Sequence, residues 1–391
     1  MTVQRPRVSV AACASYDLDT VSTALQRALD PLGGMGSFVS PGQRVFLKVN
    51  LLMKAAPERA VTTHPEFVRA VIRAAFAAGA ADVAVGDSPG GRNSAASTRA
   101  LFETSGIAAV CQQEGARVSL LDDAVSRVSF QGGSLYSSFN LGSEAVGADV
   151  LISLPKLKTH GFMMFTGGVK NLFGCIPGLE KAQFHLKVPD RQDFAEMLVD
   201  LMLACAPELT IMDAVIGMEG DGPAGGPPRQ IGALLASPDP AALDVIASAI
   251  AGFDPMDVYT VRAAARRGLA PASPAGVSVV GDDWERFVMR DFAHPARDMS
   301  RRLPPRVARW VRKRIVSRPV LSDPAGCTAC RTCEQNCPVS AITMAEKRPA
   351  FDYDTCIRCY CCQELCPQQV IGLRRPWAVR KFFVPDAARK A

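Results

Sequence analysis

Cysteines near the C-terminus repeat one spacing twice, and this pattern restricts the fold more than any other feature of the chain. Residues 327–337 and residues 356–366 each follow C-x2-C-x2-C-x3-C, and a proline follows each copy. Of the 13 cysteines in the chain, nine lie within residues 327–366. A disulfide framework would distribute its cysteines through a small secreted chain. The pattern therefore predicts a compact metal-binding module.

The repeated spacing is that of the bacterial run that binds two [4Fe–4S] clusters, in which the fourth cysteine of a run binds the other cluster. We therefore expect each cluster to take three ligands from one copy and one ligand from the other. The expected ligands are Cys327, Cys330, Cys333 and Cys366 for cluster 1, and Cys356, Cys359, Cys362 and Cys337 for cluster 2. Structural zinc is the alternative, but zinc closes with four ligands and does not require two tandem runs. Cys361 is outside this register and is expected to be a free thiol packed beside its neighbour.

The module resembles a bacterial-type dicluster ferredoxin over residues 321–373. This resemblance implies transfer of single electrons to or from a protein partner, and a purely structural role for the clusters is the alternative. Cluster thiolates need a reducing compartment during assembly, so a cytoplasmic location is expected. Residues 10–13 faintly resemble a lipoprotein cleavage box, but the apolar run around them is too short for export.

Residues 1–290 alternate strand-like and helix-like segments. Strands are expected at 43–52, 82–86, 117–121, 149–154, 209–213 and 277–280, and helices at 65–79, 191–206 and 240–252. Strands separated by helices predict an α/β fold with a mostly parallel sheet covered by helices, followed by a small α+β ferredoxin domain. The expected division is an α/β domain at 1–296, a basic helical linker at 297–320, the ferredoxin domain at 321–373 and a basic tail at 374–391.

The net charge of +6 is unevenly distributed along the chain. Basic residues gather at 290–318 and 373–391, which leaves the rest of the chain acidic overall. This distribution argues against a nucleic-acid binder with a diffuse basic surface. Residues 301–315 are expected to form a basic helix that packs on the acidic domain or receives an acidic redox partner, and contact with an anionic membrane surface is the alternative. No apolar run is long enough to span a membrane.

Residues 153–185 concentrate basic side chains directly after a buried strand. In an open α/β sheet this position lies at the carboxyl end of the strand, where ligand-binding clefts form. Lysine side chains and backbone N–H groups near glycine suit a phosphate or a carboxylate. We expect catalytic roles for His160, Lys170 and His185, and substrate binding by Lys48, Asn50, Asp87, Lys156, Lys158 and Asn171. A solvated basic loop without a ligand is the alternative.

Polar residues near other strand ends have both a structural and a functional interpretation. Thr63 and His64 precede a helix and either cap it or belong to the site. Asp244 is expected to begin a helix and to interact with its dipole. Cys175 is expected to be a buried thiol rather than a third metal ligand with His185. Three acidic residues around a glycine-dense segment are either metal ligands or turn formers: Asp213, Glu219 and Asp221.

Six motifs occur in one order along the large domain: KVNL, GDSPG, LISLPKLKTH, GGVKNLFGCIPGLEKAQFH, MEGDGPAGG and ASPDPAALDVIA. In these motifs the chain resembles the family called domain of unknown function 362, which often carries a dicluster ferredoxin at its C-terminus. The resemblance covers roughly residues 40–280 and the cysteine module. It implies one coherent site that contains Lys48, Asp87, Lys156, Lys158, His160, Lys170, Asn171 and His185, but it implies no reaction.

Two functions are compatible with these features. The first is a ferredoxin-coupled reductase, in which the clusters deliver electrons to an anionic small molecule and a histidine or lysine supplies the proton. The second is an electron-transfer adaptor without catalysis, whose large domain docks a redox partner. No GxGxxG fingerprint follows the first strand, so the electron donor is expected to be another protein rather than a dinucleotide.

Overall fold

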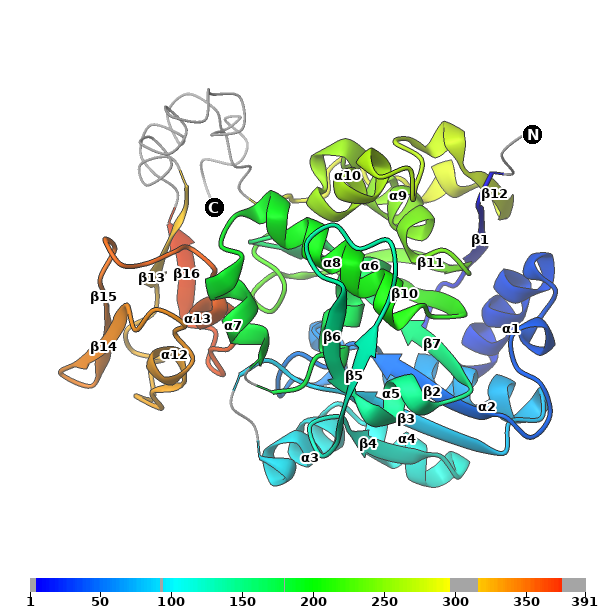
Figure 1. Ribbon diagram of the computed structural model, residues 1–391, viewed down its shortest axis with the longest axis horizontal. Helices are drawn as coiled ribbons and strands as arrows, with labels where there is room; N and C mark the ends of the chain where they lie inside the picture. The colour runs from blue at the N-terminus through cyan, green and yellow to red at the C-terminus, as the bar shows by residue number, and fades with distance from the viewer. Residues whose placement is uncertain (1–4, 92–93, 179, 296–315, 375–391) are drawn as a thin grey trace.

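A large mixed sheet with helices on both faces forms the body of the protein, and the cysteine module packs at one side of it (Figure 1). The computed structural model describes residues 5–91, 94–178, 180–295 and 316–374. Within these residues the main sheet has 10 strands in the order β12-β1-β11-β10-β7-β2-β3-β4, with β8 beside β10 and β9 beside β8. The strands are β1 (Arg7–Ala12), β2 (Arg44–Val49), β3 (Asp82–Asp87), β4 (Arg117–Leu120), β7 (Val150–Leu154), β8 (Lys156–His160), β9 (Met164–Thr166), β10 (Leu209–Met218), β11 (Pro228–Ser237) and β12 (Ser278–Gly281).

The prediction of a mostly parallel sheet is confirmed. Among the described strands of this sheet, only β11 and β9 run antiparallel to their neighbours. Successive side chains of a strand point to opposite faces, so Val45 and Leu47 enter the core on one face while Phe46 enters the core on the other. This double burial explains the nearly continuous apolar runs of the central strands.

Helices cover the two faces as separate layers. One layer contains α1 (Leu18–Leu29), α2 (Pro65–Ala77), α3 (Ala95–Thr104) and α4 (Ile107–Glu114). The other contains α5 (Ser143–Gly147), α6 (Gly168–Asn171), α7 (Glu180–Lys187), α8 (Arg191–Cys205), α9 (Pro240–Ile250) and α10 (Tyr259–Arg266), next to a hairpin of β5 (Val125–Ser129) and β6 (Ser138–Gly142). The short helix α6 lies against α9, which places the Gly167-Gly168 segment in the core.

The structure differs from the predicted elements at two strands. Residues 156–160 were expected in a loop, but they form β8, which pairs in parallel with β10. The alternating lysines of this segment look solvent-exposed in sequence, whereas pairing with β10 buries them. The strand expected at 209–213 continues to Met218 and returns as β11, which was not predicted.

The expectation for Asp244 is wrong. Helix α9 begins at Pro240, and Asp239 caps it by accepting hydrogen bonds from the backbone N–H groups of residues 241 and 242. Asp244 lies inside the helix and is buried. Its carboxylate accepts hydrogen bonds from Gly168 N at 2.6 Å and Val169 N at 3.1 Å, so it caps the neighbouring helix α6 instead.

The cysteine module is built from two small antiparallel strand pairs and two single-turn helices. Strand β13 (Arg318–Leu321) pairs with β16 (Ile371–Arg374), and β14 (Ile342–Ala345) pairs with β15 (Arg348–Phe351). Helices α12 (Thr332–Gln335) and α13 (Cys361–Glu364) belong to the first and second cysteine copy, respectively. The helix expected at 301–315 and the basic tail lie outside the described residues. In the part of the chain that the structure describes, no helix is long and apolar enough to cross a membrane.

Replacement of Gly167 by alanine tests the packing of α6 on α9. A β-carbon at this position would overlap the Asp244 carboxylate and approach Phe165 to 2.7 Å. We expect Gly167→Ala to lower the free energy of unfolding by roughly 1–3 kcal/mol, because the overlap displaces the cap of α6. Gly147→Ala is the matched control, since nothing lies within 4 Å of its β-carbon. Equal denaturant midpoints for the two variants would contradict this packing.

Candidate functional site

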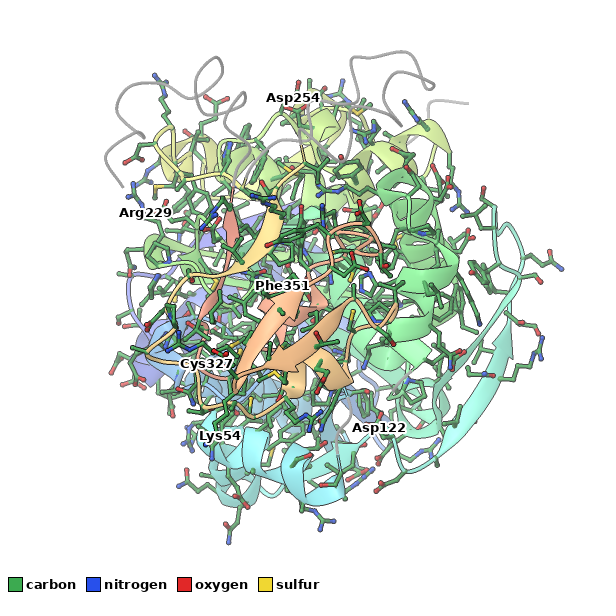
Figure 2. All side chains as sticks on the ribbon, turned by 90° about the vertical axis from the view of Figure 1, so that its left-hand side faces the viewer. Lys54, Asp122, Arg229, Asp254, Cys327 and Phe351 are labelled. Carbon is green, nitrogen blue, oxygen red and sulfur yellow. The ribbon has the colours of Figure 1, made fainter. Side chains whose placement is uncertain are left out.

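A cavity of about 100 Å³ lies between the large domain and the cysteine module, and we call it the interdomain cavity. Figure 2 views the molecule from the side of the module, with Cys327 and Phe351 in front of the large domain. Polar residues of the large domain on its wall are Asn50, Asp87, Ser88, Thr166, Lys170, Asn171, Lys181 and His185; the module contributes Asn336, Cys361, Glu364 and Leu365. A larger hollow of about 380 Å³ lies beside α3 and β4, and none of the predicted site residues lines it.

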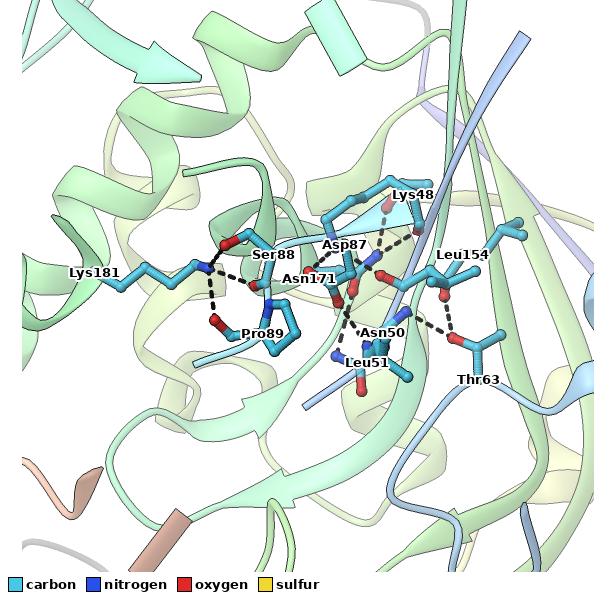
Figure 3. Close-up of polar contacts among 12 residues, drawn as sticks. Lys48, Asn50, Leu51, Thr63, Asp87, Ser88, Pro89, Leu154, Asn171 and Lys181 are labelled. Carbon is cyan, nitrogen blue, oxygen red and sulfur yellow. Dashed lines mark hydrogen bonds and ion pairs between the residues drawn. The ribbon is translucent and has the colours of Figure 1, made fainter. Parts of the chain in front are cut away.

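A buried ion pair forms the base of the site (Figure 3). Lys48 in β2 and Asp87 at the end of β3 approach to 3.0 Å. Lys48 Nζ also donates to Val49 O at 2.6 Å, and Asp87 accepts from Leu51 N at 2.6 Å. Burial raises the pKa of Asp87, and the charge of Lys48 opposes this increase. Lys48 is fully buried and does not line the cavity, so its partner is Asp87 rather than a ligand.

Two asparagines connect this ion pair to the cavity (Figure 3). Asn171 Nδ2 donates to Lys48 O and to Ser153 Oγ, both at 3.0 Å. Asn50 Nδ2 in turn donates to Asn171 Oδ1 at 3.3 Å. Thr63 supports Asn50 from behind, since its hydroxyl accepts from Asn50 N at 2.8 Å and donates to Leu154 O at 2.7 Å. Thr63 therefore joins two strand ends, and of the two expected caps only His64 caps α2.

Lys181 holds the loop that follows β3. Its ammonium group donates to Ser88 O, to Ser88 Oγ at 2.6 Å and to Pro89 O at 3.2 Å. Burial lowers the pKa of Lys181 to about 8, and the charges of Asp87 and Asp122 oppose this decrease. With three oxygen acceptors from the loop, Lys181 positions one wall of the cavity (Figure 3).

Lys170 and His185 face the cavity from α6 and α7. Lys170 Nζ lies 5.4 Å from the centre of the Phe173 ring, and burial lowers its pKa. The His185 ring stacks on Phe194 with 4.6 Å between ring centres. Burial, together with the nearby charge of Lys170, lowers the pKa of His185 to about 3, so this imidazole is neutral at physiological pH.

Glu364 of the module inserts among basic residues of β8 and α6. His160 Nε2 lies 3.2 Å from Glu364 Oε1. His160 Nδ1 accepts from the backbone N–H groups of Phe162 and Met163, so the proton of the neutral ring resides on Nε2. Nε2 and Glu364 Oε1 approach each other without hydrogen-bond geometry. Burial and the nearby charge of Lys170 lower the pKa of Lys158 to about 7, although the charge of Glu364 opposes this decrease.

Glu364 was not among the predicted site residues. It lies between the third and fourth cysteines of the second copy, where glutamate and glutamine occur in both copies, and only the docked position of α13 distinguishes it.

Lys156 is not brought to the cavity. It belongs to a separate buried cluster, in which its ammonium group contacts Asp213 at 2.8 Å and the Tyr16 hydroxyl at 2.5 Å. The His64 ring stacks on Tyr16 with 3.5 Å between ring centres. Asp213, in β10, therefore pairs with Lys156, which is neither of the two roles expected for it. Lys158 also points elsewhere, because its Nζ donates to Val61 O at 2.7 Å.

The cysteines of the two copies are interleaved in space. Burial raises the pKa of Cys337, and Cys359 and Cys356 of the other copy add to the increase. Burial likewise raises the pKa of Cys333 to about 11, and Cys366 and Cys330 add to it. A small hollow is lined by Cys327, Cys330, Cys333 and Cys366. In the described residues no three His, Cys, Asp or Glu side chains gather tightly enough for a single metal ion, whereas Cys₄ sets that exchange their fourth ligand suit [4Fe–4S] clusters.

The remaining two cysteines of interest lie near the cavity. Cys361 is buried and lines the cavity wall, beside Cys359, with which it shares a hydrogen bond. Cys175 is buried beside Cys205.

Comparison with known families identifies both parts of the chain. Residues 45–249 match the family model described as Domain of unknown function (DUF362). The chain belongs to this family. Residues 319–367 of this DUF362 protein match a 4Fe-4S dicluster domain. The protein therefore combines a DUF362 domain with a ferredoxin-like module for iron–sulfur electron transfer.

Two curated proteins resemble this DUF362 protein over different lengths. A thylakoid-associated protein of Synechocystis is 42% identical over 273 residues, which are 68% of this chain and 81% of that protein. One component of an ion-translocating oxidoreductase complex of Methanosarcina acetivorans is 41% identical over 49 residues, which are 12% of this chain and 19% of that protein.

Two solved structures show remote likeness. A Thermotoga maritima protein has a TM-score of 0.34 at 11% identity, covering 53% of this chain and 52% of its own. The lactate racemase apoprotein of Thermoanaerobacterium thermosaccharolyticum has a TM-score of 0.38 at 12% identity, covering 60% of this chain and 54% of its own. At these TM-scores neither likeness supports a conclusion about the DUF362 protein.

The buried ion pair predicts a large effect of Lys48→Met on stability. Removal of the ammonium group leaves the Asp87 carboxylate buried without its partner, which typically costs about 3–5 kcal/mol. We expect a correspondingly lower free energy of unfolding in denaturant titrations of the cluster-containing protein. Arg44→Met is the control. Arg44 lies on the same strand as Lys48, but its ion pair with Asp149 is exposed. A stability loss in the control as large as that of Lys48→Met would contradict this account.

His185 predicts a pH dependence of stability. Its pKa is about 3 in the folded protein and about 6.5 when unfolded. Because the unfolded chain then binds more protons, the free energy of unfolding falls as the pH is lowered below about 6.5. The variant His185→Phe keeps an aromatic ring against Phe194 but has no group that titrates. We therefore expect its free energy of unfolding to depend less steeply on pH between about pH 5 and 7.5. Thermal unfolding of the cluster-containing protein at several pH values measures this dependence. The same pH dependence in the wild type and in His185→Phe would contradict a buried, neutral His185.

Proposed function

We propose that the protein is a ferredoxin-coupled reductase that acts on a small anionic molecule bound in the interdomain cavity. The observation that carries this proposal is that one cavity touches both parts of the chain. Cys361 and Glu364 of the module line the same cavity as Lys170 and His185 of the DUF362 domain. An electron that leaves the module on this side arrives where a substrate can be held and protonated.

The proposal assigns two clusters and a direction of transfer. Cluster 1 takes Cys327, Cys330, Cys333 and Cys366, and cluster 2 takes Cys356, Cys359, Cys362 and Cys337. Cys330 is exposed, whereas Cys359 and Cys362 are buried. Cluster 1 therefore receives electrons from a protein donor at the surface. Cluster 2 passes them to the cavity, because two residues next to its cysteine ligands in sequence, Asn336 and Cys361, line the cavity.

Three contacts support a fixed position of cluster 2 beside the cavity. Glu364 Oε1 lies 3.2 Å from His160 Nε2, and Gln363 Nε2 donates to Asp221 O at 3.0 Å. The Arg191 guanidinium lies 5.7 Å from the centre of the Tyr360 ring. Since all three involve residues 360–364, the segment between the second and fourth cysteines of this copy is docked on the large domain.

The size of the cavity supports a protein donor rather than a dinucleotide. Ligand pockets for drug-sized molecules and cofactors typically measure about 300–1,000 Å³, whereas this cavity measures about 100 Å³. A nicotinamide or flavin therefore does not fit beside the module. Electrons arrive through the clusters, and the cavity serves a small substrate.

Lys170 both binds the anion and supplies a proton in this proposal. Reduction of a small organic anion consumes electrons and protons together, and an ammonium group with a lowered pKa gives up its proton more readily. Burial lowers the pKa of Lys170. The other two predicted catalytic residues, His160 and His185, have lowered pKa values and are neutral at physiological pH, so we assign them hydrogen bonding to the substrate rather than supply of the proton. The reducing conditions that cluster assembly requires favour a cytoplasmic location.

The test is reoxidation of the reduced clusters by candidate substrates. The anaerobic protein is reduced with dithionite, excess reductant is removed, and the recovery of cluster absorbance is followed after addition of small carboxylates and oxoanions. We expect recovery at least about 100-fold slower in Lys170→Met, because the anion contact and the proton donor are both lost. The exposed lysine variant Lys54→Met is the control and should recover at the wild-type rate.

The adaptor function gives a different result in the same experiment. A non-catalytic electron carrier would be reoxidised by protein acceptors at the exposed Cys330 side, and Lys170→Met would not affect it. Recovery in Lys170→Met at the wild-type rate would therefore reject the reductase assignment.

A further inference from the structure

Five polar atoms on the wall of the interdomain cavity are buried without a hydrogen-bond partner. Two of them, Asp87 Oδ1 and Glu364 Oε1, each lie within 3.2 Å of a basic side chain. The other three have no such neighbour: Asn50 Oδ1, Thr166 Oγ1 and His185 Nδ1. Buried polar atoms in folded proteins are nearly always hydrogen-bonded, so three such atoms around one cavity indicate a site for a polar ligand. Lys170 Nζ adds a fourth group, since it makes no hydrogen bond to any other residue that the structure describes.

The orientation of the Asn50 amide follows from its neighbours. Asn171 donates through Nδ2 to the carbonyl oxygen of Lys48, which can only accept. Asn171 Oδ1 is therefore an acceptor, and Asn50 must donate to it through Nδ2. This leaves Asn50 Oδ1 as a fixed acceptor at the cavity, so the ligand must present a hydrogen-bond donor to it.

The wall carries two ammonium groups, Lys170 and Lys181, and two carboxylates, Asp87 and Glu364. Lys181 and Asp87 already have partners, so Lys170 is the group that selects an anion at the other end of the ligand. Lys170 faces the cavity and is the residue next to Asn171 in α6. Lys48 and Lys158 lie buried behind the wall, and each contributes to the electrostatics of the cavity groups. Lysine ammonium groups bind carboxylate and phosphate oxygens. Asn50 Oδ1 is an uncharged acceptor, and a hydroxyl group is the smallest donor on a short carboxylate that satisfies it.

The volume limits the size of the ligand. An apolar cavity of about 150 Å³ admits a benzene ring, and the interdomain cavity measures about 100 Å³. The enclosed part of the ligand therefore has no more than about six non-hydrogen atoms.

From these four constraints we infer that the cavity binds a short carboxylate that carries a hydroxyl group. The carboxylate lies on Lys170, the hydroxyl group donates to Asn50 Oδ1, and Thr166 and His185 complete the polar contacts. The inference rests on the proposed function in taking this cavity as the substrate site, with the hydroxycarboxylate as substrate or product. It concerns binding only and requires no electron transfer.

Three probes of equal size separate the two contacts. Glycolate has both the carboxylate and the hydroxyl group, propanoate has a methyl group in place of the hydroxyl, and glycolamide has an uncharged amide in place of the carboxylate. Binding is measured by calorimetry on the oxidised, cluster-containing protein. We expect glycolate to bind at least about tenfold more tightly than either of the other probes, because each of them leaves one buried group of the wall without a partner.

Two variants assign the contacts. Asn50→Leu should bind glycolate and propanoate equally, and Lys170→Met should bind glycolate and glycolamide equally. Lys54→Met should keep the wild-type order, and cluster absorbance reports whether each variant is folded. Equal affinity of the wild type for glycolate and propanoate would overturn the inference, as would unchanged discrimination in a folded Asn50→Leu protein.

The outcomes for binding and for the reductase are separable. If glycolate binds as expected but no small anion reoxidises the clusters, the binding inference holds and the reductase is rejected. Conversely, rapid reoxidation by carboxylates without a hydroxyl group, together with no preference for glycolate, would keep the reductase and reject the hydroxycarboxylate.

Discussion

The ion pair between Lys48 and Asp87 is the interaction on which the candidate site depends. It joins two adjacent parallel strands at their carboxyl ends, and both side chains are buried. Asn171 binds the main chain of Lys48, and this contact places α6 and therefore Lys170 at the cavity. Asp244 caps the other end of α6 from the core. The basic side chain that faces the cavity is thus held by buried polar contacts at both ends of one short helix.

The docked cysteine module forms the other side of the candidate site. Ferredoxin-like modules exchange electrons through their exposed edges, but here the edge that contains Cys361 and Glu364 is covered by the DUF362 domain. Glu364 enters a region with Lys158 and Lys170, where an unpaired carboxylate would be costly to bury and the two ammonium groups would repel each other. The charges of the two parts compensate each other, which favours a single docked orientation.

The sequence predicted the region of the candidate site more accurately than it predicted the roles of individual residues. The α/β class, the parallel sheet and the importance of residues 153–185 could be predicted, because the apolar periodicity and the order of strands and helices indicate them. The partners of Lys48 and Lys156 could not, since an ion pair between distant strands leaves no local signal. Strand β8 could not be predicted either, because its lysines look exposed until β10 lies beside them.

The sequence by itself determined the chemistry of the module and the class of the large domain. Cysteine spacing along a short segment restricts the geometry of its thiolates directly, and six ordered motifs were sufficient for membership of the family. Only the tertiary structure decided that Asn50, Lys170, His185 and Glu364 share one cavity while Lys156 does not. These residues lie on separate segments of the chain, and their meeting depends on strand order and on how the module docks, which no local pattern encodes.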